Sequence, residues 1–281
     1  MRGWALQNRR RSNLCWAECG AETLRLRPRR LPVVGTISVV IPALNDARYL
    51  EVCLAAVAVK TRQADEVIVV DNGSTDDTAA VAHAHGATVL SQPLRGILSA
   101  AATGYDAAGS DIIARLDADS IPPIDWLERV ETALSTAPPL SAVTGMGDYY
   151  DSGPTTAWLG RFVYLGGYFW SMGWLLGHPP VYGSNFAMHR DFWERTRTGV
   201  HRDIRKLHDD LDLSIHVEPD MTVLYDHALR VGVSARPFQS VGGIARRIWW
   251  AYLTLSANWR EDSLLRRRRV RRRAARRASG G

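Results

Sequence analysis

The architecture follows from one short stretch, Ile37-Ser-Val-Val-Ile-Pro-Ala-Leu-Asn-Asp46. Its first five residues are mostly apolar and β-branched, which is typical of a buried strand, and Pro42 ends the run. Residues 47–60 then show helical periodicity, and a second apolar run, residues 66–70, ends in a polar turn at 71–75. Strand, helix and strand in this order are the repeating unit of a parallel sheet.

The same alternation continues as far as residue 145. Further strands are predicted at residues 88–90, 111–116 and 140–145, and helices at residues 76–86, 96–108 and 125–135. Thr75 is the predicted N-cap of the helix over 76–86. The sequence therefore predicts an α/β fold, a mostly parallel sheet with helices on both faces. Such sheets bind ligands at the carboxyl ends of their strands.

Charge is divided unevenly along the 281 residues. The net charge is +6, but residues 1–31 carry +6 and residues 266–277 carry +9, so the body between them is acidic at −9. An acidic body argues against a general nucleic-acid-binding domain, and nucleic acid is not an expected partner. Three cysteines cannot form a disulfide framework, which favours a reducing, cytoplasmic compartment.

These features divide the chain into four parts. Residues 1–33 are predicted to be a basic, disordered arm, because they show neither periodicity nor the apolar core of a secretory leader. Residues 34–240 form the predicted globular body. Residues 241–265 are a predicted amphipathic aromatic helix, and residues 266–281 are an Arg-rich tail.

Two acidic residues follow the predicted strand 111–116. Asp117 and Asp119 are two positions apart, so in extended backbone their carboxylates point to the same side and repel each other. A cation or a basic group between the two carboxylates relieves this repulsion, and Mg²⁺ and Mn²⁺ are hard divalent ions that bind one or two carboxylates together with substrate phosphates. A metal that bridges a diphosphate would neutralise the charge on a leaving group. The alternative is a solvated acidic turn without a ligand.

Three motifs together resemble the family 2 glycosyltransferases of GT-A fold. They are the stretch 37–46, Val67-Ile-Val-Val-Asp-Asn-Gly-Ser-Thr-Asp76 and Arg115-Leu-Asp-Ala-Asp119, in the family's order. The resemblance implies a nucleotide-sugar-binding half over residues 34–120 and an acceptor half over residues 121–240. It implies transfer of one sugar from a nucleotide-diphosphate donor to a hydroxyl or phosphate acceptor, with inversion and with Mn²⁺ or Mg²⁺ as cofactor. The Gln-x-x-Arg-Trp signature of processive synthases does not occur at Gln239, which precedes Ser-Val-Gly-Gly.

The resemblance also assigns residues to the donor side. Nucleotide and phosphate contacts fall on Pro42, Ala43, Asn45, Asp71 and Asp117. The metal falls on Asp117 and Asp119, with His227 as a candidate for a further ligand. Such enzymes often have Arg-Asn in the helix before the fourth strand, where this chain has Ala101 and Ala102, so Arg95 is the candidate for the missing phosphate contact. For Pro42 and Asp71 the alternative is ordinary turn chemistry.

Two later segments resemble the acceptor side of the family. Val181-Tyr-Gly-Ser-Asn-Phe-Ala-Met-His-Arg190 matches a Gly-x-Asn-x-x-x-x-Arg pattern that implies Gly183 and Asn185 lie beside the acceptor. Leu207-His-Asp-Asp-Leu-Asp-Leu-Ser214 is similar to a Glu-Asp-x-Asp-Leu segment, with Asp209 at the Glu position. Asp210 then falls on the general base that removes the acceptor proton in an inverting transfer. The alternative is an acidic helix N-terminus that only stabilises the helix.

Aromatic residues crowd the second half of the chain. No charged residue occurs from Phe162 to Leu176, a run of 15, which is shorter than the ~20 residues of a spanning helix. Five glycines in residues 160–177 weaken a simple helix, so an interfacial or groove-forming segment fits better. Residues 246–255 mix arginines with aromatics in an amphipathic pattern. We therefore expect peripheral attachment to the inner, anionic face of the membrane and a carbohydrate or lipid-linked acceptor. The alternative is a buried aromatic core with a solvated tail.

Two other functions compete with a glycosyltransferase. A sugar-phosphate nucleotidyltransferase would carry a glycine-rich, basic loop after the first strand, which Ala43-Leu-Asn-Asp46 does not provide. A catalytically silent protein that docks on membrane or RNA would not need the acidic residues at 71, 117, 119 and 210. The acidic pattern therefore favours the enzyme.

Overall fold

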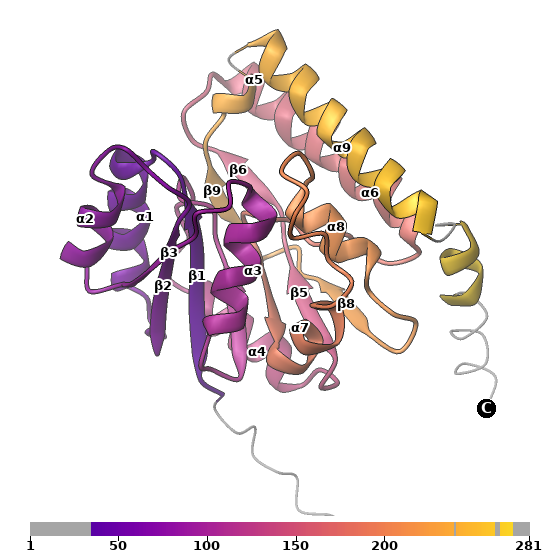
Figure 1. Cartoon of the computed structure of the whole chain (residues 1–281), viewed down its shortest axis with the longest axis horizontal. Coiled ribbons are helices and arrows are strands. Elements are labelled where there is room, and N and C mark those ends of the chain that lie inside the picture. Colours follow the sequence, from indigo (N-terminus) through magenta and orange to yellow (C-terminus); the bar gives the residue numbers. More distant parts are fainter. Residues whose placement is uncertain (1–34, 239, 262–264, 272–281) are drawn as a thin grey trace, which may run out of the picture. The chain divides into compact units, whose positions relative to one another are not determined.

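Seven strands form the central sheet of the computed structural model, which describes residues 35–238, 240–261 and 265–271 (Figure 1). They are β1 (Ile37–Ala43), β2 (Glu66–Asp71), β3 (Thr88–Ser91), β4 (Ile112–Arg115), β5 (Ser141–Thr144), β7 (Phe186–His189) and β8 (Thr222–Tyr225). Their order in the sheet is β3-β2-β1-β4-β7-β5-β8. Only β7 runs antiparallel to its two neighbours in this sheet. The predicted α/β fold with a mostly parallel sheet is therefore confirmed.

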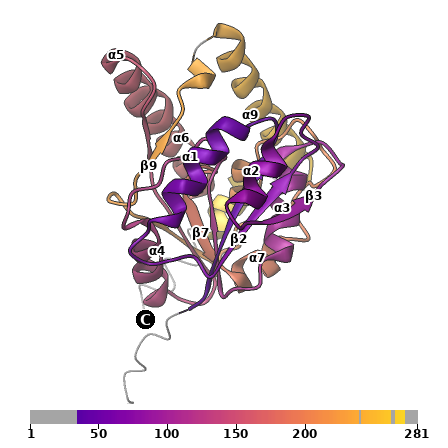
Figure 2. The same cartoon turned by 90° about the vertical axis from the view of Figure 1, so that its left-hand side faces the viewer.

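Helices cover both faces of this sheet because its strands are apolar on both sides. On β1, Val39 and Ile41 pack against one face, whereas Val40 packs against the other. The first face is covered by α1 (Ala47–Ala58), α2 (Thr78–Ala84) and α4 (Trp126–Ser135). The second is covered by α3 (Ile97–Ala107), α7 (Arg190–Thr196) and α8 (Asp209–Ile215). Figure 2 shows α4 and α7 on opposite sides of the strands.

One predicted helix cap is wrong. Helix α2 begins at Thr78, and Thr75 lies in the preceding loop. The backbone N–H of Thr75 donates to Asn45 Oδ1 (2.8 Å), which ties Thr75 to the loop after β1. The N-cap position is Asp77, which makes no side-chain cap hydrogen bond, and Asp76 Oδ1 accepts from the Thr78 N–H at 3.1 Å.

The aromatic segment is helical in spite of its glycines. Helix α5 (Pro154–Trp158), a π-helix (Leu159–Leu165) and α6 (Gly166–Leu176) follow one another without a break. A second small sheet pairs β6 (Gly147–Tyr149) with β9 (Val231–Val233) in parallel. None of the helices in the described part of the chain has the length and apolar character needed to span a membrane.

The last helices pack on the body of the protein. Helix α9 (Val241–Glu261) lies beside α6 (Figure 1), and Leu255 of α9 packs with Leu176 and Leu211 in a small apolar cluster. Residues 265–271 are helical. Arg267 donates to the Ile215 carbonyl at the end of α8, and Arg271 donates to the Val217 carbonyl just after it. The start of the predicted Arg-rich tail is therefore docked. The predicted arm over residues 1–33 and the end of that tail lie outside the described residues.

Candidate active site

A pocket of about 390 Å³ opens at the carboxyl ends of β1 and β4. Its walls come from the loops after these strands, the start of α3, the segment before β7, the start of α8, and α9. The predicted site residues that line it are Pro42, Ala43, Arg95, Asp117, Asp119, Gly183, Asp209 and Asp210. The fold thus brings residues from distant motifs to the edge where parallel sheets bind ligands.

A buried arginine joins the acidic residues of two motifs. Arg115, the last residue of β4, is only 1% exposed. Its Nη1 donates to Asp117 Oδ1 (2.7 Å) and to the Gly183 carbonyl, and its Nη2 lies 2.9 Å from Asp209 Oδ2. The Ser184 hydroxyl donates to the other oxygen of Asp117. Arg115 therefore connects the loop after β4 with the start of α8.

These contacts give Asp117 and Asp209 different pKa values. Burial opposes ionisation of Asp117, but Arg115 and the Ser184 hydrogen bond outweigh it and lower the pKa of Asp117. Burial and the charges of Asp210 and Asp117 raise the pKa of Asp209 to about 6, against the attraction of Arg115. Asp117 is therefore ionised in conditions where Asp209 can still hold a proton.

Asp119 faces a different cation. Arg236, in the 3₁₀ turn Arg236–Phe238, donates to Asp119 Oδ2 and to Asp46 Oδ1, both at 2.7 Å. Its guanidinium lies 4.0 Å from the ring centre of Tyr49. Burial and the charge of Asp117 raise the pKa of Asp119, and Arg236 opposes that shift. Arg236 thus balances the negative charges of Asp46 and Asp119, which lie in the loops after β1 and β4.

The predicted general base lies at the start of α8. Asp210 Oδ2 accepts a hydrogen bond from the Gly183 backbone N–H (3.0 Å), and its Oδ1 accepts one from the Leu211 N–H (2.7 Å). A Cβ at Gly183 would lie 3.0 Å from Arg115 Nη1 and 3.4 Å from Asp210 Oδ2. Glycine therefore lets the backbone pass between these two groups and hold the Asp210 carboxylate in place.

Asn45 and Asp71 lie outside the pocket lining and organise its loops. Asp71 Oδ1 accepts from the Ser74 N–H (2.9 Å), which closes the turn after β2. Asn45 adopts a positive φ of 53°, and its backbone N–H donates to Ser74 Oγ at 2.9 Å. These bonds join the loop after β1 to the loop after β2. Donor binding by Asn45 and Asp71 stays a prediction.

Asn185 is buried, and its hydrogen bonds are made within the protein. Its Oδ1 accepts from Trp126 Nε1 (2.9 Å), and its Nδ2 donates to the carbonyls of Met146 (3.1 Å) and Leu229 (2.8 Å). These contacts fix the chain immediately after Gly183. The structure therefore supports a positioning role for Asn185, and its contact with the acceptor stays a prediction.

His227 lies apart from the two metal-site aspartates. Its ring packs edge-on against Tyr225, with ring centres 4.6 Å apart, and it does not line the pocket. Within residues 35–238, 240–261 and 265–271, no three His, Cys, Asp or Glu side chains are grouped so that they could hold a metal ion. A metal would therefore rely on fewer protein ligands than the three that we predicted.

The carboxylate oxygens of Asp117 and Asp119 fit a hard divalent cation. Asp117 and Asp119 line the same pocket, and the charge of Asp117 raises the pKa of Asp119, as expected for two neighbouring carboxylates. Arg236 already places a positive group against Asp119. Mg²⁺ and Mn²⁺ commonly use one or two carboxylates and complete their coordination with water and substrate phosphate. The two aspartates present such an incomplete donor set.

Helix α9 forms part of the pocket wall, which the sequence did not indicate. Trp250, Arg246 and Arg247 line the pocket from this helix. His208 ties the helix to the start of α8, because its N–H donates to Thr254 Oγ1 (2.9 Å) and its Nε2 lies 3.0 Å from the Arg247 carbonyl. The predicted amphipathic helix therefore belongs to the site.

Sequence reasoning also missed most of the arginines of the pocket. The chain has only two lysines among 35 basic residues, so arginine content alone gave no signal for Arg205 or Arg236. Arg115 could have been found, because a charged residue that ends an apolar strand must be paired when it is buried.

Comparison with known proteins agrees with this fold. The sequence profile described as glycosyl transferase family 2 matches residues 38–196, more than half of the chain. An uncharacterized glycosyltransferase of Mycobacterium tuberculosis is 46% identical over 83 residues, which cover 30% of this chain and 36% of that relative. The match thus spans about a third of the length of that curated relative.

Two solved structures share the architecture. Glucosyl-3-phosphoglycerate synthase of M. tuberculosis, in complex with Mn²⁺, UDP and phosphoglyceric acid, has a TM-score of 0.57 at 26% identity, over 80% of this chain and 78% of that chain. A mannosyltransferase of Pyrobaculum calidifontis, in complex with GDP-Man and Mn²⁺, has a TM-score of 0.62 at 20% identity, over 82% of this chain and 66% of that chain. The profile match and the shared architecture lead to one conclusion: the chain belongs to glycosyl transferase family 2 and has the GT-A fold.

Proposed function

We propose that this protein transfers one sugar from a nucleotide-diphosphate donor to an acceptor hydroxyl or phosphate, with inversion. The observation that carries this proposal is the composition of the pocket, which is lined by five aspartates and five arginines. Carboxylates can bind a metal and remove a proton, whereas guanidinium groups match the geometry of phosphate oxygens. Both kinds of group are needed when a diphosphate leaves and an acceptor loses its proton.

Asp210 is the proposed general base. Each of its oxygens accepts one backbone hydrogen bond, and a carboxylate oxygen has a second lone pair for a substrate O–H. Asp210 would take that proton as the acceptor oxygen bonds to the anomeric carbon and the bond to the diphosphate breaks. The backbone contacts keep the carboxylate oriented during this step.

Asp117 and Asp119 are the proposed ligands of Mn²⁺ or Mg²⁺. The two solved relatives described above contain Mn²⁺ together with UDP or GDP-Man, which supports this assignment. When bound, the ion neutralises charge on the leaving diphosphate. Arg236 would then exchange its contact with Asp119 for one with a phosphate, because it lines the same pocket. Arg95 lines that pocket too and is the second proposed phosphate contact.

We also propose that the acceptor is reached at a membrane surface. Large aromatic side chains are exposed on α5, the π-helix and α6 (Trp158, Phe162, Trp170, Trp174) and on α9 (Trp249, Tyr252, Trp259). Such rings favour the membrane–water interface, and the arginines of α9 and residues 265–271 would attract anionic headgroups. Because α9 also lines the catalytic pocket, this surface would bring that pocket close to a lipid-linked acceptor.

A panel of nucleotide sugars tests the proposed reaction. The protein is incubated with Mn²⁺ and each UDP- or GDP-sugar, with and without lipid fractions as acceptor, and release of the nucleotide diphosphate is measured. We expect turnover of one donor and a loss of about 100-fold or more in Asp210→Asn, which is the usual contribution of a general base. Asp119→Ala should lose the metal dependence of that turnover.

The controls separate catalysis from folding and binding. Asp77→Asn changes an exposed carboxylate outside the pocket and should keep the wild-type rate. Asp210→Asn should still bind the donor nucleotide in calorimetry. If the wild-type protein neither releases nor binds any nucleotide in the presence of Mn²⁺, the transferase proposal fails, and a silent docking protein becomes the better description.

A further inference from the structure

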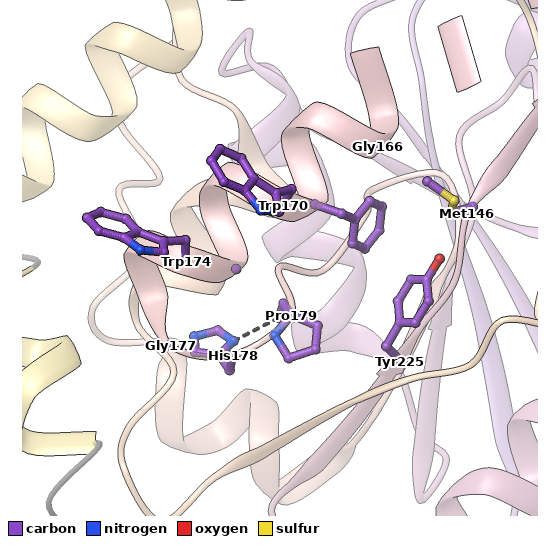
Figure 3. A pocket seen from close by; sticks show the side chains of 10 residues that line it. Met146, Gly166, Trp170, Trp174, Gly177, His178, Pro179 and Tyr225 are labelled. Atoms are coloured by element: carbon purple, nitrogen blue, oxygen red, sulfur yellow. Dashed lines mark hydrogen bonds between the residues drawn. The ribbon is translucent and has the colours of Figure 1, made fainter. Parts of the chain in front are cut away.

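A second hollow lies along α6, apart from the pocket that contains Asp210. Its volume is about 620 Å³, which is larger than the catalytic pocket. Trp170 and Trp174 project beside it from α6, Pro179 lies below them, and Tyr225 closes the opposite side (Figure 3). We call this hollow the α6 groove. None of its lining residues is needed by the reaction proposed above.

Glycines keep the α6 groove open. Gly166 and Gly173 are seven residues apart and therefore lie on one face of α6. A Cβ would meet the nearest atom at 3.5 Å on Gly166 and at 3.7 Å on Gly173, which are ordinary contact distances. Glycine is a poor helix former, and the packing of the protein does not require it at these two positions. The glycines therefore serve the open groove.

The α6 groove is apolar and carries no ionised acid or base of its own. Apart from indole N–H groups, its lining offers only His178 and Tyr225 as polar side chains. Burial lowers the pKa of His178 to about 4, so its ring is neutral near pH 7. Its Nδ1 lies 2.8 Å from the Pro179 carbonyl oxygen, within hydrogen-bond distance. A sugar ring would need several hydrogen-bonding partners, which these walls do not supply. The lining suits a hydrocarbon chain.

The position of the α6 groove relates it to catalysis. Phe169 lines the groove, and its ring packs against Tyr182, which lines the catalytic pocket, with ring centres 6.4 Å apart. At the other end, the Arg268 guanidinium lies 3.9 Å from the ring centre of Trp174. The arginines that line the catalytic pocket, near one end of the groove, complement the anionic head of an elongated lipid, and the groove itself takes the apolar chain.

We infer that the α6 groove holds the hydrocarbon chain of a phosphate-bearing lipid acceptor, while the reacting head of that lipid enters the pocket beside Asp210. This inference rests on the proposed glycosyl transfer and names its acceptor class. It explains why an apolar groove of this size borders the acceptor side of the fold. It also explains the exposure of Trp170 (76%) and Trp174 (55%), since both rings would be covered by the chain or by the membrane from which it comes.

Filling the groove tests this inference. Gly173→Leu places a side chain in the groove without a backbone clash, and Gly167→Leu is the matched control, because Gly167 is on the same helix, has free space around it and does not line the groove. Farnesyl phosphate and isopentenyl phosphate serve as long-chain and short-chain acceptors. We expect wild type and Gly167→Leu to favour farnesyl phosphate, with a KM at least tenfold lower. Gly173→Leu should lose this preference while its donor KM is unchanged.

A binding measurement separates this inference from the proposed reaction. A farnesyl phosphate analogue with a diazirine on its chain is photo-crosslinked, and the labelled peptides are identified by mass spectrometry. Label in residues 166–179 or at Tyr225, reduced at least fivefold in Gly173→Leu, supports the groove even if no donor is turned over. Equal labelling of the two leucine variants overturns it. Competition by methyl glucoside would show a sugar site instead, and a change of oligomeric state in Gly173→Leu would show a contact between copies; either result also overturns it.

Discussion

At the scale of single residues, Arg115 does most to assemble the site. Its guanidinium is buried among three oxygen partners, which come from Asp117, Asp209 and the Gly183 carbonyl. A buried ion pair contributes little compared with an apolar pair of the same shape, but removal of one member leaves the others as uncompensated buried charges. Arg115 is therefore a positioning residue whose loss affects both stability and the geometry of the two acidic motifs.

We expect Arg115→Met to lower the free energy of unfolding by about 3–5 kcal/mol, because Asp117 and Asp209 lose their shared cation. Urea denaturation measures this change. Arg129→Met is the matched control, since Arg129 pairs with Asp125 at 2.6 Å but both side chains are more than a third exposed. Removing that surface pair should cost no more than about 1 kcal/mol. Equal losses in the two variants would show that Arg115 has no special role.

His178 makes stability depend on pH. Burial, reinforced by the charge of Arg271, lowers the pKa of His178 to about 4, whereas an unfolded chain binds the proton near its usual value of about 6.5. Between these two values the unfolded chain carries the extra proton, so the free energy of unfolding falls as pH falls, by up to about 1.4 kcal/mol per unit. Urea denaturation from pH 7 to pH 4 should show a steeper fall of the free energy of unfolding in wild type than in His178→Gln, and this difference isolates His178 from carboxyl groups such as Asp209 that titrate in the same range. His83→Gln, at an exposed position on α2, should keep the wild-type slope.

At the scale of elements, α3 lies unusually close to the sheet. A Cβ on Gly104 would meet Val40 Cγ1 at 2.3 Å and Val70 Cγ2 at 3.0 Å, and both valines are fully buried. The glycine therefore sets the distance between α3 and the strands whose carboxyl ends form the pocket. Helix propensity and packing oppose each other at this position.

Gly104→Ala should destabilise the protein by about 1–3 kcal/mol, because the cost of overpacking exceeds the gain in helix propensity. Gly167→Ala, which meets no atom within 4 Å, should instead stabilise it by up to about 1 kcal/mol. Thermal unfolding of both variants measures the difference in sign. A stabilised Gly104→Ala would mean that α3 can move away from the sheet at little cost.

At the scale of the whole molecule, α9 couples the exposed aromatic surface to the catalytic pocket. Asn258 of α9 donates to Asp212 Oδ1 (2.8 Å), and this buried carboxylate also accepts from the His201 N–H at 2.9 Å. Polar contacts on the buried side of α9 thus fix the helix to α8. The rings of Trp249 and Tyr252, more than half exposed, stack on the opposite side with centres 5.4 Å apart.

Replacing Trp249 and Tyr252 by serine should weaken binding to anionic vesicles at least tenfold, because the interfacial rings are lost while the buried contacts remain. Co-sedimentation with vesicles of anionic or zwitterionic lipid measures the binding, which should decrease as salt increases. Val52→Ser, at an exposed apolar residue of α1, is the control. If wild type does not bind anionic vesicles, the membrane proposal fails, while the reaction and the α6 groove remain testable with short soluble lipids.

The sequence alone determined the fold class and the acidic residues that line the pocket. Strands β1, β2 and β4 are apolar, and the loops that follow them are polar. This local pattern is typical of parallel sheets and can be read from the sequence. The family, the α/β class and the aspartates at 117, 119, 209 and 210 could therefore be predicted. Strands β7 and β8 could not be predicted, because each has only four residues and follows an irregular segment. Their pairing with β5 in the folded sheet identifies them as strands.

The tertiary structure alone decided which cations meet these acids. Arg236 reaches Asp46 across 190 positions of sequence, and no local pattern records a contact of that separation. Helix α9 became a wall of the pocket because its buried face packs on α8, whereas its amphipathic pattern was equally consistent with a separate membrane anchor. Local sequence specifies strands and turns through short-range sterics, whereas ion pairs and grooves depend on how distant segments pack.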